Sequence, residues 1–391
     1  MSGHATAVAG MSFEFATAGR VIVGPGRAAE LAPVLAGLGS RVLVVTGSRP
    51  GSQAGLLAGL TLPATVVTVS GEPTTRSAEA AAVTAREHGA DVVAAVGGGS
   101  VIDLGKAVAM LLGNGGDLLD YLEVIGAGRK ITRPSVPLVA VPTTAGTGAE
   151  VTANAVLASP AHRVKASLRS PLMIPRVAIV DPLLTISCPP LVTAASGLDA
   201  LTQCLEPFVS VRANALTDCL AAAGLRHAAA GLRLAYADGT NVQARSDMAL
   251  CSLLGGMALA NAKLGAVHGL ASAIGGTTEI PHGAACAALL APVAEANVRA
   301  LRSAQPGSPA LSRYAEAARL LTGDPAATIE DGIAWIRQTV TQLQVPRLRE
   351  FGLRPEDFGD ITASAMKASS TQGNPVTLTN NDLHAILAEA E

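Results

Sequence analysis

Four side chains in the second half of the chain have the types and spacing of a divalent-metal site. Asp199 and Gln203 lie four residues apart in a segment without helix breakers, so both are expected on one face of a helix. His268 and His282 are each followed by glycine, and a proline before His282 marks a fresh helix start. Two imidazoles and two oxygen donors suit Fe(II) or Zn(II). On spacing alone, the alternative is a set of unrelated helix residues, with a surface carboxylate and an ordinary helix-forming glutamine.

Three consecutive glycines at residues 97–99 mark a second possible binding site. They follow the apolar stretch 91–96 and precede Ser100, at the start of a helical pattern. Glycine adopts backbone conformations closed to other residues and lets N–H groups approach a diphosphate, which the helix dipole also favours. Because the spacing differs from GxGxxG, the motif indicates a phosphate group more firmly than a dinucleotide. A plain strand-to-helix turn is the alternative.

A second loop of small residues, PTTAGTGAE at residues 142–150, follows another apolar stretch. Its hydroxyls and glycines fit a ligand that lies across the carboxyl ends of a parallel sheet. A threonine-rich loop that caps the next helix is the alternative. Two such loops on the same edge of a sheet favour a ligand-binding site over a capping loop.

The composition limits the class of protein. The chain has 391 residues, of which 49% are hydrophobic, 15% charged and 2% aromatic, and its formal net charge is -2. Without a basic run, and with few aromatic residues to stack on bases, nucleic acid is not an expected partner. No apolar run reaches the length needed to span a membrane, and the N-terminus lacks the features of a signal peptide. Five cysteines without a CxxC pair indicate a reducing compartment, so we expect a soluble, cytoplasmic protein.

The order of apolar and helical patterns predicts an α/β half followed by an all-α half. Strands are expected at residues 41–46, 64–69, 91–96, 136–141 and 177–181, with helical patterns between the earlier ones. This alternation predicts a parallel, Rossmann-like sheet with helices on both faces. Residues 12–23 are expected to form a hairpin of two short strands. From residue 190 onward the pattern is helical, so the predicted domains are residues 1–188 and 189–391.

Five motifs in this order resemble those of the iron-containing (group III, metal-dependent) alcohol dehydrogenases. Residues 97–106 resemble the family's GGGSxxDxxK phosphate loop, residues 142–148 its PTTxGTG segment and residues 180–182 its VDP. The sequences around Asp199, His268 and His282 resemble its metal-binding stretches. The resemblance implies an N-terminal NAD(P)-binding domain, a C-terminal helical metal and substrate domain, and a cleft between them that holds NAD(P) and a divalent metal. Fe2+ is the favoured metal and Zn2+ the alternative.

The resemblance also implies roles for individual residues. Those implied to contact the cofactor are Gly98, Gly99, Ser100 and Asp103 at the phosphate loop, Thr143, Thr144 and Thr147 around the nicotinamide half, and Lys165 near a ribose. Asp199, His268 and His282 match three metal ligands and are therefore the implied catalytic residues.

Three positions depart from many relatives. Gln203 stands where the usual fourth ligand is a histidine, and its carbonyl oxygen is a weaker donor for iron or zinc than imidazole. Ser272 replaces a histidine on the proton path, so water, a ribose hydroxyl or Ser272 itself is expected to take over. Leu259 replaces a phenylalanine and is expected to enlarge an apolar substrate pocket.

The choice between NAD and NADP depends on the end of the strand expected at residues 41–46. Sites that prefer NAD place a carboxylate there, against the adenosine ribose. This chain has Gly47, Ser48 and Arg49, which leave room for a 2′-phosphate and supply groups to bind it. The sequence therefore leans to NADP, with a neutral turn that accepts either cofactor as the alternative.

The implied activity is that of a metal-dependent, NAD(P)-linked alcohol dehydrogenase or aldehyde reductase. A hydride would pass between C4 of the nicotinamide and a metal-bound alcohol or carbonyl, with the metal as Lewis acid. The apolar pocket favours an aliphatic or bulkier aldehyde over a polyol. Relatives often pair through N-terminal strands, so residues 13–23 suggest a homodimer or higher homo-oligomer.

Three alternatives share part of this pattern. A dehydroquinate-synthase-like lyase and a maleylacetate-reductase-like oxidoreductase both need basic side chains to anchor an acidic substrate, and residues 199–282 are poor in them. The third is a dinucleotide-binding protein with a degenerate metal site, which Gln203 and Ser272 would fit.

Overall fold

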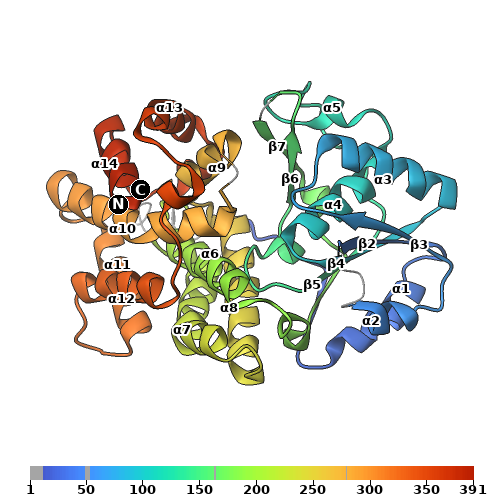
Figure 1. The fold of residues 1–391 in the computed structure, drawn as a ribbon, viewed down its shortest axis with the longest axis horizontal. Helices are drawn as coiled ribbons and strands as arrows, with labels where there is room; N and C mark the ends of the chain where they lie inside the picture. The colour runs from blue at the N-terminus through green and yellow to red at the C-terminus, as the bar shows by residue number, and fades with distance from the viewer. Residues whose placement is uncertain (1–11, 49–52, 163, 279) are drawn as a thin grey trace, which may run out of the picture. The chain divides into compact units, whose positions relative to one another are not determined.

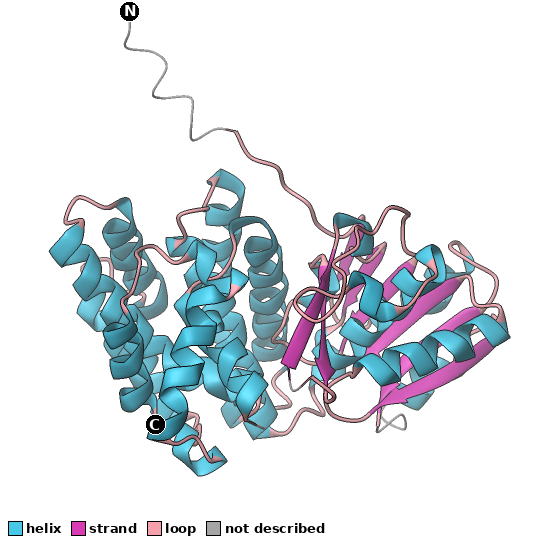
Figure 2. Cartoon of the chain, turned by 90° about the horizontal axis from the view of Figure 1, so that it is seen from above, coloured by secondary structure: helices cyan, strands magenta, loops and turns pink. Residues whose placement is uncertain are grey.

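The computed structural model describes residues 12–48, 53–162, 164–278 and 280–391, which form two compact units. The first, the α/β unit, comprises residues 17–189 and 239–249. The second, the helical unit, comprises residues 190–238 and 250–391 together with the described residues before Thr17. Within the described ranges, every strand belongs to the α/β unit (Figure 1, Figure 2). The predicted fold class, a Rossmann-like α/β part and an all-α part, is confirmed.

A six-stranded parallel sheet forms the centre of the α/β unit. Its strands are β1 (Arg20–Val23), β2 (Val42–Gly47), β3 (Ala64–Val69), β4 (Val92–Gly97), β5 (Leu138–Pro142) and β8 (Val177–Val180). Their order is β1-β8-β5-β4-β2-β3, and every neighbouring pair is parallel. The inner strands β4, β5 and β8 are buried along their whole length, as the continuous apolar runs predict for strands covered on both faces.

Helices cover the two faces of this sheet. Alternate residues of each strand point to opposite faces, so Val42 and Val44 pack with α1 (Leu31–Ala36) and α2 (Ala54–Ala58). Leu43 and Val45 face the other side and pack with α3 (Thr75–His88) and α4 (Gly99–Asn114). Both cores consist mainly of Ala, Val, Leu and Ile, as the small aromatic content requires.

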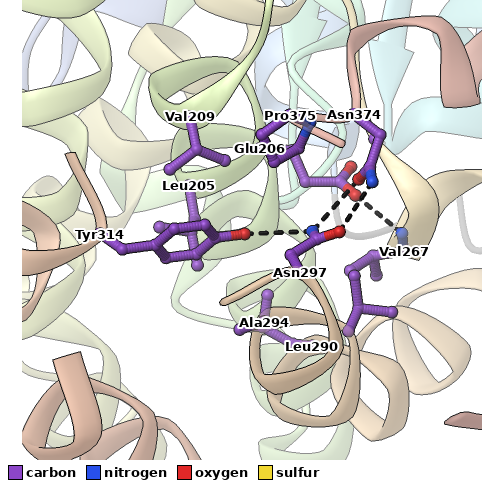
Figure 3. A pocket seen from close by; sticks show the side chains of 12 residues that line it. Leu205, Glu206, Val209, Val267, Leu290, Ala294, Asn297, Tyr314, Asn374 and Pro375 are labelled. Atoms are coloured by element: carbon purple, nitrogen blue, oxygen red, sulfur yellow. Dashed lines mark hydrogen bonds between the residues drawn. The ribbon is translucent and has the colours of Figure 1, made fainter. Parts of the chain in front are cut away.

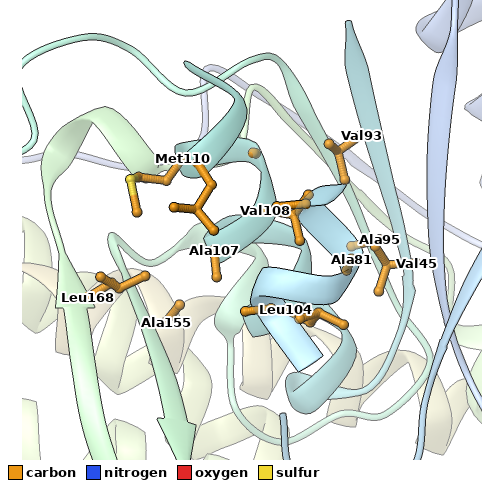
Figure 4. Close-up of a cluster of buried hydrophobic side chains, with 14 of the residues drawn as sticks. Val45, Ala81, Val93, Ala95, Leu104, Ala107, Val108, Met110, Ala155 and Leu168 are labelled. Carbon is orange, nitrogen blue, oxygen red and sulfur yellow. The ribbon is translucent and has the colours of Figure 1, made fainter. Parts of the chain in front are cut away.

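Helix α4 is buried between the sheet and a second, smaller sheet. This is an antiparallel hairpin of β6 (Asn154–Ser159) and β7 (Val164–Arg169), which the sequence reading did not predict. Ala155 and Leu168 of the hairpin pack on one side of α4, and Val93 and Ala95 of the large sheet pack on the other (Figure 4). Because α4 is held from both sides, the turn at its N-terminus has a fixed position.

The hairpin predicted for residues 12–23 is wrong. Only Arg20–Val23 is a strand, and it pairs in parallel with β8. Upstream, the backbone of Ala16 donates to and accepts from the side chain of Asn261, at 2.7 Å and 2.9 Å. The apolar residues of this segment thus find partners far along the chain, which a local alternation pattern does not reveal.

The helical unit is built from nine α-helices in the described part of the chain. They are α6 (Pro190–Val209), α7 (Ala215–Ala237), α8 (Val242–Ala262), α9 (Ala266–Thr277), α10 (His282–Ala304), α11 (Pro309–Thr322), α12 (Ile329–Gln342), α13 (Phe358–Lys367) and α14 (Asn380–Ala390). The first residues of α8 belong to the α/β unit. Helix α6 packs against α7 and α10, and α10 also packs against α9. This arrangement brings α6, α9 and α10 together.

Among the described residues, one helix has the length and overall composition to cross a membrane. This helix is α10, and 78% of its apolar 18-residue stretch is buried inside the structure. Helices α8 and α9 pass the same test only when they are taken together, and they meet at an angle of 96°. The apolar character of α10 is explained by its burial among other helices of the unit.

Candidate metal centre and cofactor site

Three helices of the helical unit bring the predicted metal ligands together. Asp199 lies on α6, His268 in the first turn of α9 and His282 at the first residue of α10. Oδ1 of Asp199 is 3.2 Å from Nε2 of His268 and 3.9 Å from Nε2 of His282. The centroids of the two imidazole rings are 5.4 Å apart. Residues that lie up to 83 positions apart in sequence, from 199 to 282, therefore share one small volume.

Unpaired atoms show that this volume suits a cation. Among the described residues, Oδ1 of Asp199, Oε1 of Gln203 and Nε2 of His268 are buried and form no hydrogen bond of acceptable geometry. Leaving such an atom buried and unpaired costs roughly 1–3 kcal/mol. A divalent metal bound among these atoms would satisfy them. The side chain of His282 is 37% exposed, against 3% for Asp199, so the cluster is open on the side of His282.

Gln203 lies one turn after Asp199 on α6, as the four-residue spacing predicts. It is buried, and its unpaired Oε1 is the only part of the side chain with the electron pairs to bind a cation. Gln203 is therefore available as a weak oxygen donor in place of the family's usual histidine.

Cys286 belongs to the same cluster, and the sequence reading missed it. Its Sγ lies 3.6 Å from Nε2 of His282, one turn earlier on α10. The potential donor atoms of Asp199, His268, His282 and Cys286 all lie within 4.8 Å of one another. The signal that could have revealed it is the four-residue spacing of His282 and Cys286, the same spacing that paired Asp199 with Gln203.

Glu206, also missed in the sequence, fixes the orientation of His268. Its Oε2 lies 2.7 Å from Nδ1 of His268, and its Oε1 accepts the backbone N–H of Val267 at 2.7 Å. A proton on Nδ1 leaves Nε2 with the lone pair that a metal needs. Glu206 approaches the helix start closely at Gly265, where an added Cβ would lie 2.8 Å from Oε1. One carboxylate thus caps α9 and sets the tautomer of its histidine.

A small cavity of about 10 Å³ adjoins Glu206, close to the space that one water needs (Figure 3). Asn374 accepts the backbone N–H of Ala266 at 3.0 Å, and its amide donates to Oδ1 of Asn297 at 2.7 Å. Asn297 in turn donates to the hydroxyl of Tyr314 at 3.1 Å. This polar network supports the start of α9 through the backbone N–H of Ala266.

The charges in the cluster influence one another. Burial alone would raise the pKa of Asp199, but the side chain of His268 and the positive charges of both histidines lower it below its ordinary value. The carboxylate is thus ionised, as a metal ligand must be. Burial disfavours the charged form of His268, yet Cys286, Asp199 and Glu206 together raise its pKa well above the ordinary value. The cluster attracts positive charge, whether as protons or as a cation.

Of the predicted pocket residues, Ser272 lies on α9, which carries His268, and Leu259 lies on α8, which packs against Gln203. Gly255 of α8 would bring an added Cβ within 3.2 Å of Cβ of Gln203, and Leu259 follows one turn later, half-buried. Ser272 follows His268 by one turn on α9 and is exposed. Both residues therefore lie one helical turn from a residue that forms or touches the cluster.

The predicted phosphate turn and the threonine loop lie at adjacent strand ends of the α/β unit. Gly97 ends β4 and is in register with Pro142, which ends β5, and the backbone N–H of Thr143 donates to the carbonyl of Gly97 at 3.0 Å. β2 neighbours β4 on its other side, and the helices that follow these two strands, α2 and α4, cover opposite faces of the sheet. Such a reversal creates a crevice at the carboxyl ends of the strands, where open α/β sheets bind ligands.

The glycines of the first loop lie close against threonine side chains of the second. An added Cβ on Gly99 would lie 2.7 Å from Cγ2 of Thr147, and one on Gly98 would lie 3.3 Å from Oγ1 of Thr144. Helix α4 begins at Gly99, with Ser100 next, and carries no side-chain cap. Its first N–H groups are therefore available to an anion, which the helix dipole favours.

Asp103 and Lys165 have protein partners of their own. Oδ2 of Asp103 accepts the backbone N–H of Val156 at 3.0 Å, and burial raises the pKa of this carboxyl to about 6 although Lys106 opposes the shift. Lys106 is fully buried and donates to the hydroxyl of Thr152 at 2.8 Å. Asp103 and Lys106 thus attach α4 to the β6 region. Lys165 on β7 pairs with Glu72 at 2.7 Å.

The carboxyl end of β2, which is expected to select between NAD and NADP, has free space beside its last residue. Gly47 ends β2, and an added Cβ there would meet nothing within 4 Å. Ser48 follows and is exposed, with no carboxylate at either position. Arg49, the third residue of that prediction, lies outside the described residues.

Comparison with known proteins identifies the family. The model described as "Iron-containing alcohol dehydrogenase" matches residues 18–182, and that described as "Fe-containing alcohol dehydrogenase family, C-terminal" matches residues 193–391. Alcohol dehydrogenase 4 of Saccharomyces cerevisiae is 37% identical over 306 residues, which are 78% of this chain and 77% of the yeast protein. 1,3-Propanediol dehydrogenase of Klebsiella pneumoniae is 38% identical over 311 residues, with the same shares covered. A crystal structure of 1,3-propanediol oxidoreductase matches with a TM-score of 0.90 at 33% identity, over 97% of this chain and 100% of that chain.

These matches cover both units, and they confirm the resemblance found in the motifs. They also agree with the parallel sheet, the helical second half and the cluster of possible metal ligands. The chain belongs to the iron-containing alcohol dehydrogenase family, whose members are NAD(P)-linked, metal-dependent oxidoreductases of alcohols and aldehydes.

Proposed function

We propose that this chain interconverts an aliphatic alcohol and its aldehyde with NADP or NAD, at a divalent-metal site held by Asp199, His268 and His282. The observation that carries the proposal is the convergence of buried donor atoms without hydrogen-bond partners, Oδ1 of Asp199 and Nε2 of His268, with Nε2 of His282 beside them. The proposal assigns cofactor binding to residues 1–188 and metal and substrate binding to residues 189–391.

The metal, Fe2+ or Zn2+, supplies a Lewis acid that polarises the substrate oxygen, and the nicotinamide supplies or accepts the hydride at C4. The residues of the chain provide the fixed geometry on which both depend. Asp199 contributes a negative charge from a buried position, and Glu206 holds His268 with Nε2 toward the cluster. Gln203 offers a weak oxygen donor beside them.

On the cofactor side, we assign the diphosphate to the N–H groups at the start of α4, at Gly98, Gly99 and Ser100. Thr143, Thr144 and Thr147 are assigned to the nicotinamide half. The close packing of Thr147 on Gly99 supports this assignment, because it holds the two loops in one surface. Asp103 contributes by holding α4 through Val156, and Lys165 is assigned to the ribose, where Glu72 competes for its ammonium group.

The preference for NADP rests on the end of β2. The open space at Gly47 would accept a 2′-phosphate, and the hydroxyl of Ser48 would donate to it. A carboxylate, which would repel the phosphate and bind a free ribose hydroxyl instead, is absent from both positions.

The substrate class rests on Leu259 and on the relatives. Leu259 adds apolar surface one turn from the helix position that contacts Gln203, which favours an aliphatic chain. The names of the propanediol relatives denote a short acyclic alcohol. Residues 199–282 are poor in Lys and Arg, which disfavours the acidic substrates of a maleylacetate reductase or a dehydroquinate-synthase-like lyase. The exposed hydroxyl of Ser272, water or a ribose hydroxyl then carries the proton to solvent.

Turnover with and without metal tests the proposal. The purified chain is stripped of metal, reconstituted with Fe2+ under anaerobic conditions or with Zn2+, and mixed with NADPH or NADH and a series of aliphatic aldehydes. We expect loss of the reduced-nicotinamide absorbance only when metal and aldehyde are both present. Equal turnover without metal would contradict the metal site, and bound cofactor without turnover on any aldehyde would indicate a degenerate site.

The assembly and location of the chain are also proposals. Strand β1 lies at an edge of the sheet, which leaves one side of it open to a second copy, so we propose a homodimer or higher homo-oligomer. All five cysteines are free, which supports a reducing, cytoplasmic environment. Sedimentation velocity of the full chain would test the first of these proposals.

A further inference from the structure

Cys286 brings one more protein donor to the metal cluster. It lies on the same face of α10 as His282, and its Sγ is 3.6 Å from Nε2 of that residue. Its side chain is fully buried, so the thiol faces other protein groups and not solvent. The position of Cys286 within 4.8 Å of the donors of Asp199 and His268 makes it part of the cluster and not a neighbour of it.

Two further observations indicate that the thiol acts as a ligand. The buried donor atoms of Asp199 and His268 have no hydrogen-bond partner, so the volume they share with Cys286 requires a cation or a proton. Apart from Cys286, the cluster also has only three strong donors, because the fourth position, Gln203, offers only a neutral amide oxygen. The other buried thiols do not share this environment: Sγ of Cys204 lies 3.8 Å from Sγ of Cys251.

We propose that Cys286 binds the metal as a thiolate beside Asp199, His268 and His282, and that this donor set favours Zn2+ over Fe2+. The inference rests on the proposed function, since it needs a metal at the same cluster. On binding, the S–H bond breaks, the proton passes to solvent and a sulfur–metal bond forms, without any transfer of electrons. One thiolate, two imidazoles and one carboxylate are donors of the number and types that zinc takes in proteins.

The thiolate changes the charge of the centre. Asp199 and Cys286 together carry two negative charges and neutralise a divalent ion, whereas Asp199 alone leaves one positive charge. Soft sulfur donors suit zinc better than they suit ferrous iron, so this one residue would distinguish the chain from relatives with an all-oxygen-and-nitrogen site.

Substitution with cobalt tests the thiolate directly, because Co2+ occupies zinc sites and a thiolate ligand adds an intense near-ultraviolet charge-transfer band. The metal-free full chain is titrated with Co2+, and the absorbance spectrum and the cobalt bound per chain are recorded. The variants are Cys286→Ser, which keeps the size of the side chain, Cys286→Ala, and Cys204→Ala as a control that removes a buried thiol elsewhere. We expect the band in the wild type and in Cys204→Ala, and cobalt without the band in both Cys286 variants.

The outcomes distinguish the loss of the thiolate ligand from the loss of the whole metal site. A wild type that binds cobalt without the band, or a band that persists in Cys286→Ser, overturns the thiolate ligand and leaves the metal site standing. A wild type that binds no cobalt overturns both.

Competition between the two metals tests the selectivity. Loss of the ligand in Cys286→Ser should weaken zinc binding by at least the roughly 10- to 100-fold that loss of an outer-shell partner costs. Binding of Fe2+, measured anaerobically, should weaken less, so that the ratio of the two affinities falls. Equal losses for both metals would overturn the inferred preference for zinc.

Discussion

The two candidate sites of this chain are made of different parts of the polypeptide. In the α/β unit, the surface offered to the diphosphate is backbone, at the glycine turn 97–99, where one carbon added to Gly99 would collide with Thr147. In the helical unit, the surface consists of side-chain atoms from α6, α9 and α10, and backbone plays only a supporting part. The backbone site should therefore be damaged by added atoms and the side-chain site by removed ones. Substitutions in each unit test this difference.

Removal of a ligand should have the largest effect. His268→Ala deletes Nε2, which lies 3.2 Å from Oδ1 of Asp199, and leaves the α/β unit untouched. We expect turnover to fall by roughly 1,000-fold, because the Lewis acid is worth several kcal/mol. The binding of NADPH, followed by its fluorescence, should be unchanged. His384→Ala, a change in the same unit but outside the cluster, serves as the control and should remain active.

A side chain of the α/β unit should act on stability and not on chemistry. The pKa of Asp103 is raised by burial to about 6, from an ordinary value of 3.8, so folding favours its protonated form. The stability that this group contributes is complete below about pH 4 and is lost as the pH rises through about 6. The wild type should lose on the order of 2–3 kcal/mol relative to Asp103→Asn over that range.

Urea denaturation of both proteins between about pH 4 and pH 8 measures this difference. Two stability curves that run parallel would show that Asp103 is not desolvated in the folded chain. The same proteins should bind cofactor with similar affinity, because the carboxylate holds the backbone of Val156 and an asparagine oxygen can accept the same N–H.

A supporting residue should have a smaller effect than a ligand. In Glu206→Gln the side chain keeps its size but loses the charge opposite Nδ1 of His268. We expect metal affinity to fall about 10- to 100-fold, as is typical for the loss of an outer-shell partner. Titration of the metal-free protein with Zn2+ measures the change. Glu295→Gln, on the surface of α10, is a matched control that should bind zinc as the wild type does, and an unchanged affinity in Glu206→Gln would refute the orienting role.

The same contrast explains what could be predicted from sequence. The glycine turn and the threonine loop each follow directly on a strand in the sequence. The residues that form the cofactor site therefore also form the local pattern that predicts it. Asp199 and Gln203 were recognisable for the same reason, since one helix carries both. The parallel strands were predictable because burial on both faces requires continuous apolar runs, although the alternation of β6 and β7 was overlooked.

Residues that act across helices were not predictable in this way. Glu206 meets His268 only because α6 packs near the start of α9, and no local pattern marks a carboxylate that caps another helix. The sequence around Cys286 does not distinguish it from a small buried hydrophobe, which is what most free cysteines are. Its role depends on the neighbours that folding brings to it. The error at residues 12–23 has the same origin, because the partner of β1 is β8, more than 150 residues later.

The smallest of these effects tests the backbone site. In Gly99→Ala the new Cβ would lie 2.7 Å from Cγ2 of Thr147, too close for the loop to remain where it is. Thr147 is exposed and can move, so we expect a displaced loop and a roughly tenfold loss of NADPH affinity, about 1.4 kcal/mol. Metal content should not change. Gly55→Ala in α2 is the matched control, since its Cβ would meet nothing within 4 Å, and it should bind cofactor as the wild type does. Equal cofactor binding by both variants would mean that the diphosphate does not lie against this turn, and the division between a backbone site and a side-chain site would then fail in the α/β unit.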